Sequence, residues 1–214
     1  MIREGRAFAR PVAQERDPPS NCESVMRPEI IKTTELAAGR FLRLDLLEYN
    51  DSKGVARKWE AAQRQKAQAA VYILAVLKPS NRLVVLRQYR VPIDAYCIEC
   101  PAGLIDDDEE PSAAAVRELM EETGYVGRIE WQSGPTCSSA GMTGEMVTIF
   151  RMTVDETLPE NKTPKQHLDD GEEIDVSLIP LNKLEEYLKA RVQAGDKLDS
   201  RIAAWCAAFS MSNE

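Results

Sequence analysis

Histidine, cysteine and long apolar runs are scarce in this sequence, and each shortage removes a class of function. His167 is the only histidine in 214 residues, and we expect a surface role for it because no Ser or Cys nucleophile pattern accompanies it. The five cysteines form an odd set, and their single C-x-x-C pair, Cys97 and Cys100, has no second pair to complete a zinc site. We therefore expect reduced thiols in a cytoplasmic or nuclear protein.

Membrane spans and a surplus of positive charge are also missing. No apolar run approaches the length of a membrane span, and no secretory signal segment follows Met1. Five arginines in the first 27 residues are a feature of mitochondrial leaders, but four acidic residues among them favour a flexible leader over residues 1–28. The net charge of −8 argues against sequence-independent binding to nucleic acid or to an anionic membrane.

Alternating and continuous apolar segments predict most of the secondary structure, without internal repeats. The predicted strands cover residues 40–49, 55–64, 69–77, 82–90, 96–99, 129–134, 145–154 and 173–181. Two amphipathic helices follow at 181–195 and 198–211, and the polar residues 155–173 predict an exposed loop. Strands around one central helix, with more helix at the end, predict an α+β domain that closes as a sandwich.

The central helix belongs to residues 101–125, PAGLIDDDEEPSAAAVRELMEETGY. Pro111 suits the first helical position and Gly124 offers a left-handed stop, so the helix is predicted from Pro111 to Thr123. Seven residues stand there in a specified order, which makes a chance occurrence improbable: Gly103, Glu109, Arg117, Glu118, Glu121, Glu122 and Gly124.

Helical spacing predicts that the acidic residues of this segment share one stripe. Glu118, Glu121 and Glu122 fall within roughly 100° of arc, and we expect the opposite side to be an apolar face formed by Ala113, Val116, Leu119 and Met120. A solvated helix face is the ordinary interpretation of such a run. Like charges at this spacing repel, however, and hard divalent cations such as Mg²⁺ would relieve the repulsion through oxygen ligands.

The segment resembles the complete Nudix box of the Nudix hydrolases, which split nucleoside diphosphates linked to another moiety. The resemblance implies an α/β/α Nudix sandwich over residues 57–210, preceded by a small N-terminal β-arm over residues 29–66. It implies Mg²⁺, with Mn²⁺ as a substitute, held by Glu118, Glu121, Glu122 and the carbonyl of Ala102. It also implies catalytic roles for Glu121 and Arg117, with Arg117 clamping the box glutamates.

Residues outside the box resemble the ADP-ribose pyrophosphatase branch of the family, in RQYRVPIDAYCIECPAGLID at 87–106 and RKWEAAQR at 57–64. In this branch the residue matching Trp59 stacks on adenine, and those matching Arg64 and Arg90 hold phosphate or ribose groups. A core tryptophan and a surface arginine are the structural alternatives. The substrate-binding residues implied are Phe41, Trp59, Glu60, Arg64, Arg90, Glu99, Leu104 and Ser139.

Some positions depart from the branch. Phe41 stands where close relatives often carry a tryptophan, and Ala140 stands where many carry a proline, which leaves the exact sugar preference open. Glu172 occupies the place of a catalytic carboxylate that binds metal or activates water. Its neighbour Glu173 is an open alternative.

The resemblance implies hydrolysis of ADP-ribose and related ADP-sugars to AMP and a sugar phosphate. Other substrates, such as GDP-mannose or oxidised nucleoside diphosphates, and a non-catalytic ADP-ribose sensor are the alternatives. We expect a homodimer, because a small arm with apolar residues such as Phe41, Leu42, Leu44 and Leu46 must bury them against something larger. Branch members exchange such arms, so Phe41 and Trp59 of one site would come from different subunits. No nucleic acid or membrane partner is expected.

Overall fold

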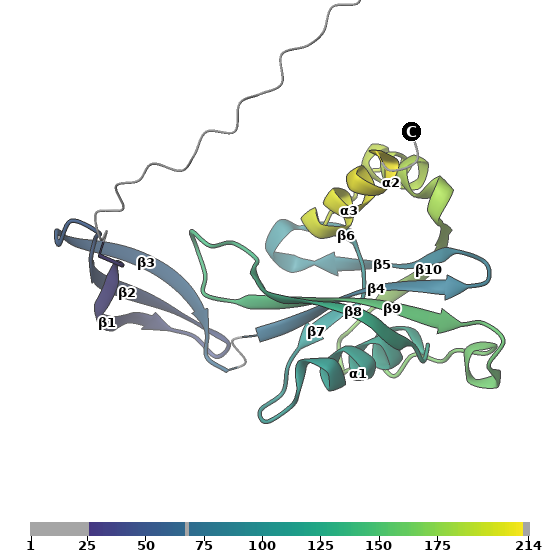
Figure 1. The fold of residues 1–214 in the computed structure, drawn as a ribbon, viewed down its shortest axis with the longest axis horizontal. Helices are drawn as coiled ribbons and strands as arrows, with labels where there is room; N and C mark the ends of the chain where they lie inside the picture. The colour runs from purple at the N-terminus through teal and green to yellow at the C-terminus, as the bar shows by residue number, and fades with distance from the viewer. Residues whose placement is uncertain (1–25, 67–68, 212–214) are drawn as a thin grey trace, which may run out of the picture.

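A computed structural model describes residues 26–66 and 69–211 of the chain (Figure 1). The first 25 residues of the expected leader lie outside this part. The described residues form an N-terminal sheet and a larger sheet with helices on both faces. Among these residues, no helix is both long and apolar enough to cross a membrane.

The N-terminal arm is a three-stranded antiparallel sheet in the order β1-β2-β3. Its strands are β1 (Glu29–Ala38), β2 (Leu42–Asn50) and β3 (Ala56–Arg64). The predicted hairpin of β2 and β3 is confirmed, and its turn is closed by the Asp51 carboxylate, which accepts from the amides of Lys53 and Val55 at 2.9 Å. Strand β1 was not predicted, because its apolar residues do not alternate regularly. Two register shifts interrupt its pairing with β2.

The main sheet has eight strands in the order β11-β6-β5-β4-β9-β8, with β10 paired to β5 and β7 paired to β4. The strands are β4 (Ala69–Lys78), β5 (Arg82–Arg90), β6 (Ala95–Glu99), β7 (Ala102–Leu104), β8 (Arg128–Cys137), β9 (Met146–Asp155), β10 (Ile174–Pro180) and β11 (Lys197–Leu198). Strands β7 and β11 were not predicted because three and two residues are too few to show an alternating pattern.

Three α-helices cover the main sheet: α1 (Pro111–Thr123), α2 (Leu184–Gln193) and α3 (Ser200–Met211). Helix α1 lies on one face, and α2 and α3 lie together on the other (Figure 1). Each face has its own apolar core. Leu119 of α1 belongs to one core, and Leu188 of α2 and Ile202 of α3 belong to the other. The predicted α/β/α sandwich is therefore confirmed. Strand β4 is a continuous apolar run because its alternate residues serve both cores.

The bounds predicted for α1 are correct, but its predicted apolar face is wrong. Val116 and Met120 are exposed, whereas the buried side consists of Ala114, Leu119 and the carboxylate of Glu122, together with Ala115 and Thr123. Small alanines let the helix approach the sheet closely. Part of the acidic stripe is thereby turned inward toward β7, instead of facing solvent on the side opposite the core.

Candidate functional site

The inner part of the acidic stripe meets the loop that precedes α1. Glu122 is only 6% exposed, and one of its carboxylate oxygens accepts a hydrogen bond of 2.9 Å from the backbone amide of Ala102 in β7. Burial raises the pKa of Glu122 to about 8, and the nearby charges of Glu118 and Glu172 act in the same direction. Burial likewise raises the pKa of Glu118. Several acidic groups are therefore crowded at this point, and a cation bound there would favour their ionised forms.

Arg117 connects the stripe to the loop. Its guanidinium lies 2.8 Å from a carboxylate oxygen of Glu118, 3.0 Å from one of Glu121 and 2.9 Å from one of Glu109. It also donates a hydrogen bond of 3.0 Å to the carbonyl of Leu104. With its donors directed at four protein groups, Arg117 acts as a clamp on the box.

Two glycines of the box are required by close approaches. A Cβ atom at Gly103 would lie 1.9 Å from the carboxylate carbon of Glu118, so any side chain there would displace this carboxylate. Gly124 ends α1 with a φ of 75°, and a Cβ atom there would lie 2.2 Å from the backbone nitrogen of Lys165. Both glycines therefore allow other segments to pack against the acidic stripe.

The donor set of the stripe fits a hard divalent cation. Glu118, Glu121 and Glu122 present carboxylate oxygens, and Glu122 has a backbone amide as its hydrogen-bond donor instead of an arginine. Within residues 26–66 and 69–211, no three Cys, His, Asp or Glu side chains already converge as metal ligands. The ion pairs with Arg117 explain this arrangement, since they direct Glu118 and Glu121 toward the guanidinium.

The polar loop before β10 closes over the end of α1. The amide of His167 donates to the carbonyl of Glu121 at 2.7 Å, and the side chain of Gln166 donates to the carbonyls of Glu122 and Ile174 at 2.8 and 3.0 Å. This docking brings the charge of Glu172 close enough to raise the pKa values of Glu118 and Glu122. Sequence reasoning missed Gln166, because nothing in a polar loop distinguishes an amide side chain that hydrogen-bonds to other segments.

Strands β5 and β6 bring Arg90 and Glu99 beside the stripe. A guanidinium nitrogen of Arg90 lies 2.9 Å from a carboxylate oxygen of Glu99, which is 6% exposed. Burial raises the pKa of Glu99, while the hydrogen bond from Arg90 opposes the shift. The charge of Glu99 in turn contributes to the raised pKa of Glu122. These groups therefore belong to one electrostatic cluster.

A second group of the predicted residues lies where β3 meets the loop between β8 and β9, residues 138–145. The indole of Trp59 donates to the carbonyl of Gly141 at 3.1 Å, and the guanidinium of Arg64 lies 2.5 Å from a carboxylate oxygen of Glu145. The carbonyl of Ser139 closes a turn in this loop by accepting from the amides of Met142 and Thr143. Sequence reasoning missed the role of Glu145, because its partner Arg64 is 81 residues away.

Phe41 and Glu60 have exposed side chains on the arm. Phe41 is 70% exposed, and its carbonyl accepts a hydrogen bond of 2.9 Å from the amide of Gln65, next to Arg64. Glu60 is exposed on β3. The register pairs Trp59 with Leu47, six residues along the strand from Phe41, which corresponds to about 20 Å. Phe41 and Trp59 of one chain therefore cannot enclose the same ring.

The thiols of the described residues do not form a reactive centre. Cys97, Cys100, Cys137 and Cys206 are free. Burial raises the pKa of Cys97 to about 11 and that of Cys100 to about 12, so both remain protonated at neutral pH. The free thiols of Cys97 and Cys100 agree with the expectation of reduced cysteines.

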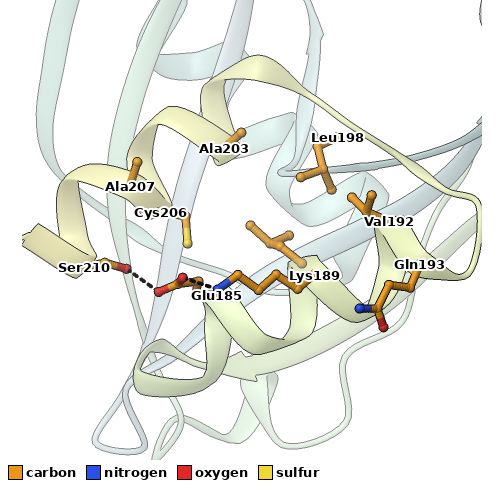
Figure 2. Close-up of a pocket in the computed structure, with 10 residues that line it drawn as sticks. Glu185, Lys189, Val192, Gln193, Leu198, Ala203, Cys206, Ala207 and Ser210 are labelled. Carbon is orange, nitrogen blue, oxygen red and sulfur yellow. Dashed lines mark hydrogen bonds and ion pairs between the residues drawn. The ribbon is translucent and has the colours of Figure 1, made fainter.

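A cavity of about 460 Å³ lies between α2 and α3 (Figure 2). Apolar side chains such as Leu188, Val192 and Leu198 line it, and the Glu185 carboxylate at its rim accepts from Lys189 at 2.6 Å and from Ser210 at 3.1 Å. The cavity is on the opposite face of the sheet from α1 and contains none of the predicted site residues. The acidic stripe is therefore the better candidate site.

Comparison with known proteins gives a consistent result. Residues 66–200 match the NUDIX domain. The ADP-ribose pyrophosphatase of Saccharomyces cerevisiae is 34% identical over 171 residues, which cover 76% of this chain and 74% of the relative. The ADP-sugar pyrophosphatase of Mus musculus is 30% identical over 200 residues, or 89% of this chain and 92% of the relative. The crystal structure of an ADP compounds hydrolase has the same fold, with a TM-score of 0.60, 22% identity and coverage of 78% of this chain and 85% of that one.

Proposed function

The chain belongs to the Nudix hydrolase family, and we propose that it hydrolyses the diphosphate bond of ADP-ribose and related ADP-sugars to AMP and a sugar phosphate. The observation that carries this proposal is the buried carboxylate of Glu122, held at Ala102 and surrounded by further acidic groups. Such a concentration of acidic groups serves a phosphate-cleaving enzyme only if a cation joins it. A sensor without turnover would not require it.

We infer that Glu118, Glu121, Glu122 and the carbonyl of Ala102 hold Mg²⁺, with Mn²⁺ as a substitute. A bound divalent cation neutralises the diphosphate and makes the attacking water more acidic. Arg117 holds Glu118 and Glu121 in place through its two ion pairs. Glu172 accepts the proton of the water. Its charge already acts on Glu118 and Glu122, which favours Glu172 over Glu173 for this role.

Substrate recognition is assigned to the two groups of residues around the stripe. Arg90, oriented by Glu99, binds a phosphate or ribose group beside the metal site, and Leu104 lines the approach. Trp59 presents a half-exposed indole for adenine, with Arg64 near the phosphates. Glu60 and Ser139 complete the proposed substrate contacts.

We further propose that the working unit is a homodimer in which Phe41 on the arm of one subunit reaches the nucleotide pocket of the other. The arm exposes many apolar side chains, among them Ile30, Ile31, Leu36, Phe41, Leu42 and Leu44. A surface of this kind is expected at an interface between copies of the chain. The separation of about 20 Å between Phe41 and Trp59 within a chain has the same implication. These two aromatics can enclose one adenine only if they come from different subunits. Trp59 contacts its own Gly141, so Phe41 is the residue that crosses.

The proposed compartment is the cytoplasm or nucleus. Free thiols in the described residues suit a reducing environment.

The function is tested by incubating the full chain with ADP-ribose, ADP-glucose, GDP-mannose and an oxidised nucleoside diphosphate, with and without Mg²⁺. Products are identified by mass spectrometry. AMP and ribose 5-phosphate formed from ADP-ribose only in the presence of Mg²⁺ support the proposal. Binding of ADP-ribose without any product would establish the sensor, and faster cleavage of GDP-mannose would change the substrate class.

A further inference from the structure

The first turn of α3 is fixed beside the end of β6, where the chain turns toward the box. Strand β11 pairs in parallel with β6, and the amide of Asp199 donates to the carbonyl of Ile98 at 3.0 Å. The Asp199 carboxylate caps α3 by accepting from the amide of Arg201 at 2.8 Å. Arg201 is therefore held next to the segment that leads from β6 into β7.

The side chain of Arg201 is anchored on both sides. A guanidinium nitrogen lies 2.8 Å from a carboxylate oxygen of Asp199, and the guanidinium carbon lies 4.5 Å from the centre of the Tyr72 ring. Tyr72 is 1% exposed, so the cation covers the ring in a position with little freedom. Arginine suits this place because its planar group can stack on a ring while it binds a carboxylate.

Tyr72 passes this constraint to the turn that holds Glu122. The Tyr72 hydroxyl accepts a hydrogen bond of 3.3 Å from the amide of Cys100, and the amide of Ile73 donates to the carbonyl of Pro101 at 2.8 Å. The next residue, Ala102, pairs with Tyr72 across β4 and β7 and donates to the carboxylate of Glu122. The contacts are continuous from α3 to the acidic stripe on the opposite face of the sheet.

We propose that Arg201 is a positioning residue of the metal site, which fixes Tyr72 and thereby the Cys100–Ala102 turn whose amide orients Glu122. This role rests on the proposed function, in that Glu122 is taken as a metal ligand. Glu122 is buried and depends on the amide of Ala102 for its orientation, so a small shift of this turn changes the direction of the carboxylate. Residues that orient a metal ligand without touching the metal are worth 10- to 100-fold in metal affinity.

The test measures metal binding and local structure in the full chain without substrate. Mn²⁺ is titrated into the protein by calorimetry, and exchange of the Ala102 amide is followed by NMR in the metal-free protein. We expect Arg201→Met to weaken Mn²⁺ binding about tenfold or more and to accelerate exchange at Ala102. Tyr72→Phe, which removes only the hydroxyl, should act in the same direction. Arg201→Lys keeps a cation over the ring and should recover part of the affinity.

Arg87→Met is the matched control. Arg87 also lies over a tyrosine, 3.4 Å from the centre of the Tyr96 ring, and its Nε lies 3.1 Å from a carboxylate oxygen of the buried Asp196. The change therefore removes the same kinds of contact from the same sheet. The side chain of Arg87 contacts Tyr96, Asp175 and Asp196, whereas that of Arg201 contacts Tyr72 and Asp199. The loss of Arg87 should leave Mn²⁺ affinity and Ala102 exchange unchanged.

The outcomes separate this role from the proposed function. If Arg201→Met and Tyr72→Phe bind Mn²⁺ as tightly as Arg87→Met, with unchanged exchange at Ala102, Arg201 is not a positioning residue. Tyr72→Phe alone decides the matter if Arg201→Met does not fold. Failure of the unmodified protein to bind Mn²⁺ would overturn the metal site itself, and with it the proposed hydrolysis.

Discussion

The backbone amide of Ala102 and the carboxylate of Glu122 are joined by a hydrogen bond of 2.9 Å, although 20 residues separate them in the chain. This bond connects the short strand β7 to the last turn of α1. It fixes the most deeply buried acid of the stripe at the point where the other acids gather. The expected activity depends on that charge being available to a cation.

The first prediction concerns pH. Burial raises the pKa of Glu122 to about 8 in the folded chain, so a protonated Glu122 stabilises the metal-free fold. This contribution is complete below the ordinary carboxylate pKa near 4.5 and is lost as the pH rises through 8. Mg²⁺ competes with the proton for the Glu122 carboxylate. The increase in Tm caused by Mg²⁺ should therefore be larger at pH 8 than at pH 5.5. Calorimetric scans with and without Mg²⁺ measure the difference, and an increase that is the same at both pH values would contradict the assignment.

The second prediction separates two neighbouring acids. Glu172→Gln should lower kcat more than it changes KM, because the interaction with the attacking water is made chiefly in the transition state. Glu173→Gln is the matched control and should have near-normal kinetics. Steady-state rates of AMP formation give both values. A large loss in the Glu173 variant with a silent Glu172 variant would reverse the assignment.

A third prediction concerns the close approach at Gly103. Gly103→Ala places a methyl group where the Glu118 carboxylate lies, so we expect at least a tenfold loss of activity even when the variant folds. Gly134→Ala is the control, because its Cβ would meet nothing within 4 Å. Activity and Tm of the two variants are compared with those of the unmodified protein. Equal activity in both would show that Glu118 can move without consequence.

The fourth prediction tests whether Phe41 crosses to the other subunit. Phe41→Ala and Glu122→Gln are mixed under conditions that allow subunits to exchange. If Phe41 crosses, a heterodimer contains one site with an intact carboxylate and an intact Phe41, so activity at low substrate concentration should exceed the sum of the separate variants. The mixture of Trp59→Ala with Glu122→Gln should show no gain, since Trp59 stays with its own chain. Light scattering that finds only monomers would remove the proposal.

The sequence predicts α1 well at its ends and poorly on its faces. Pro111 and Gly124 mark the ends because their backbone constraints are local. The buried face could not be predicted from apolarity, because the helix packs through small alanines and buries Glu122, whereas Val116 and Met120 are exposed. Local rules of this kind fail where a site requires a buried charge.

Contacts between distant segments could not be predicted from the sequence either. The pairs of Trp59 with Gly141 and of Arg64 with Glu145 join residues about 80 positions apart, and no periodicity indicates them. Strands β7 and β11 are short, yet they place Ala102 and Asp199. The box residues could be assigned because their chemistry depends on spacing within one helix and one loop.

The most direct test of the account is the rate of AMP release from ADP-ribose by Glu122→Gln at saturating Mg²⁺. This change keeps the shape of the side chain and removes its charge, and the exposed Glu110→Gln serves as the control. We expect Glu122→Gln to lose activity by at least about a hundredfold with an intact fold, and the control to keep a normal rate. A near-normal rate for Glu122→Gln would contradict the assignment of the buried carboxylate as the centre of the site.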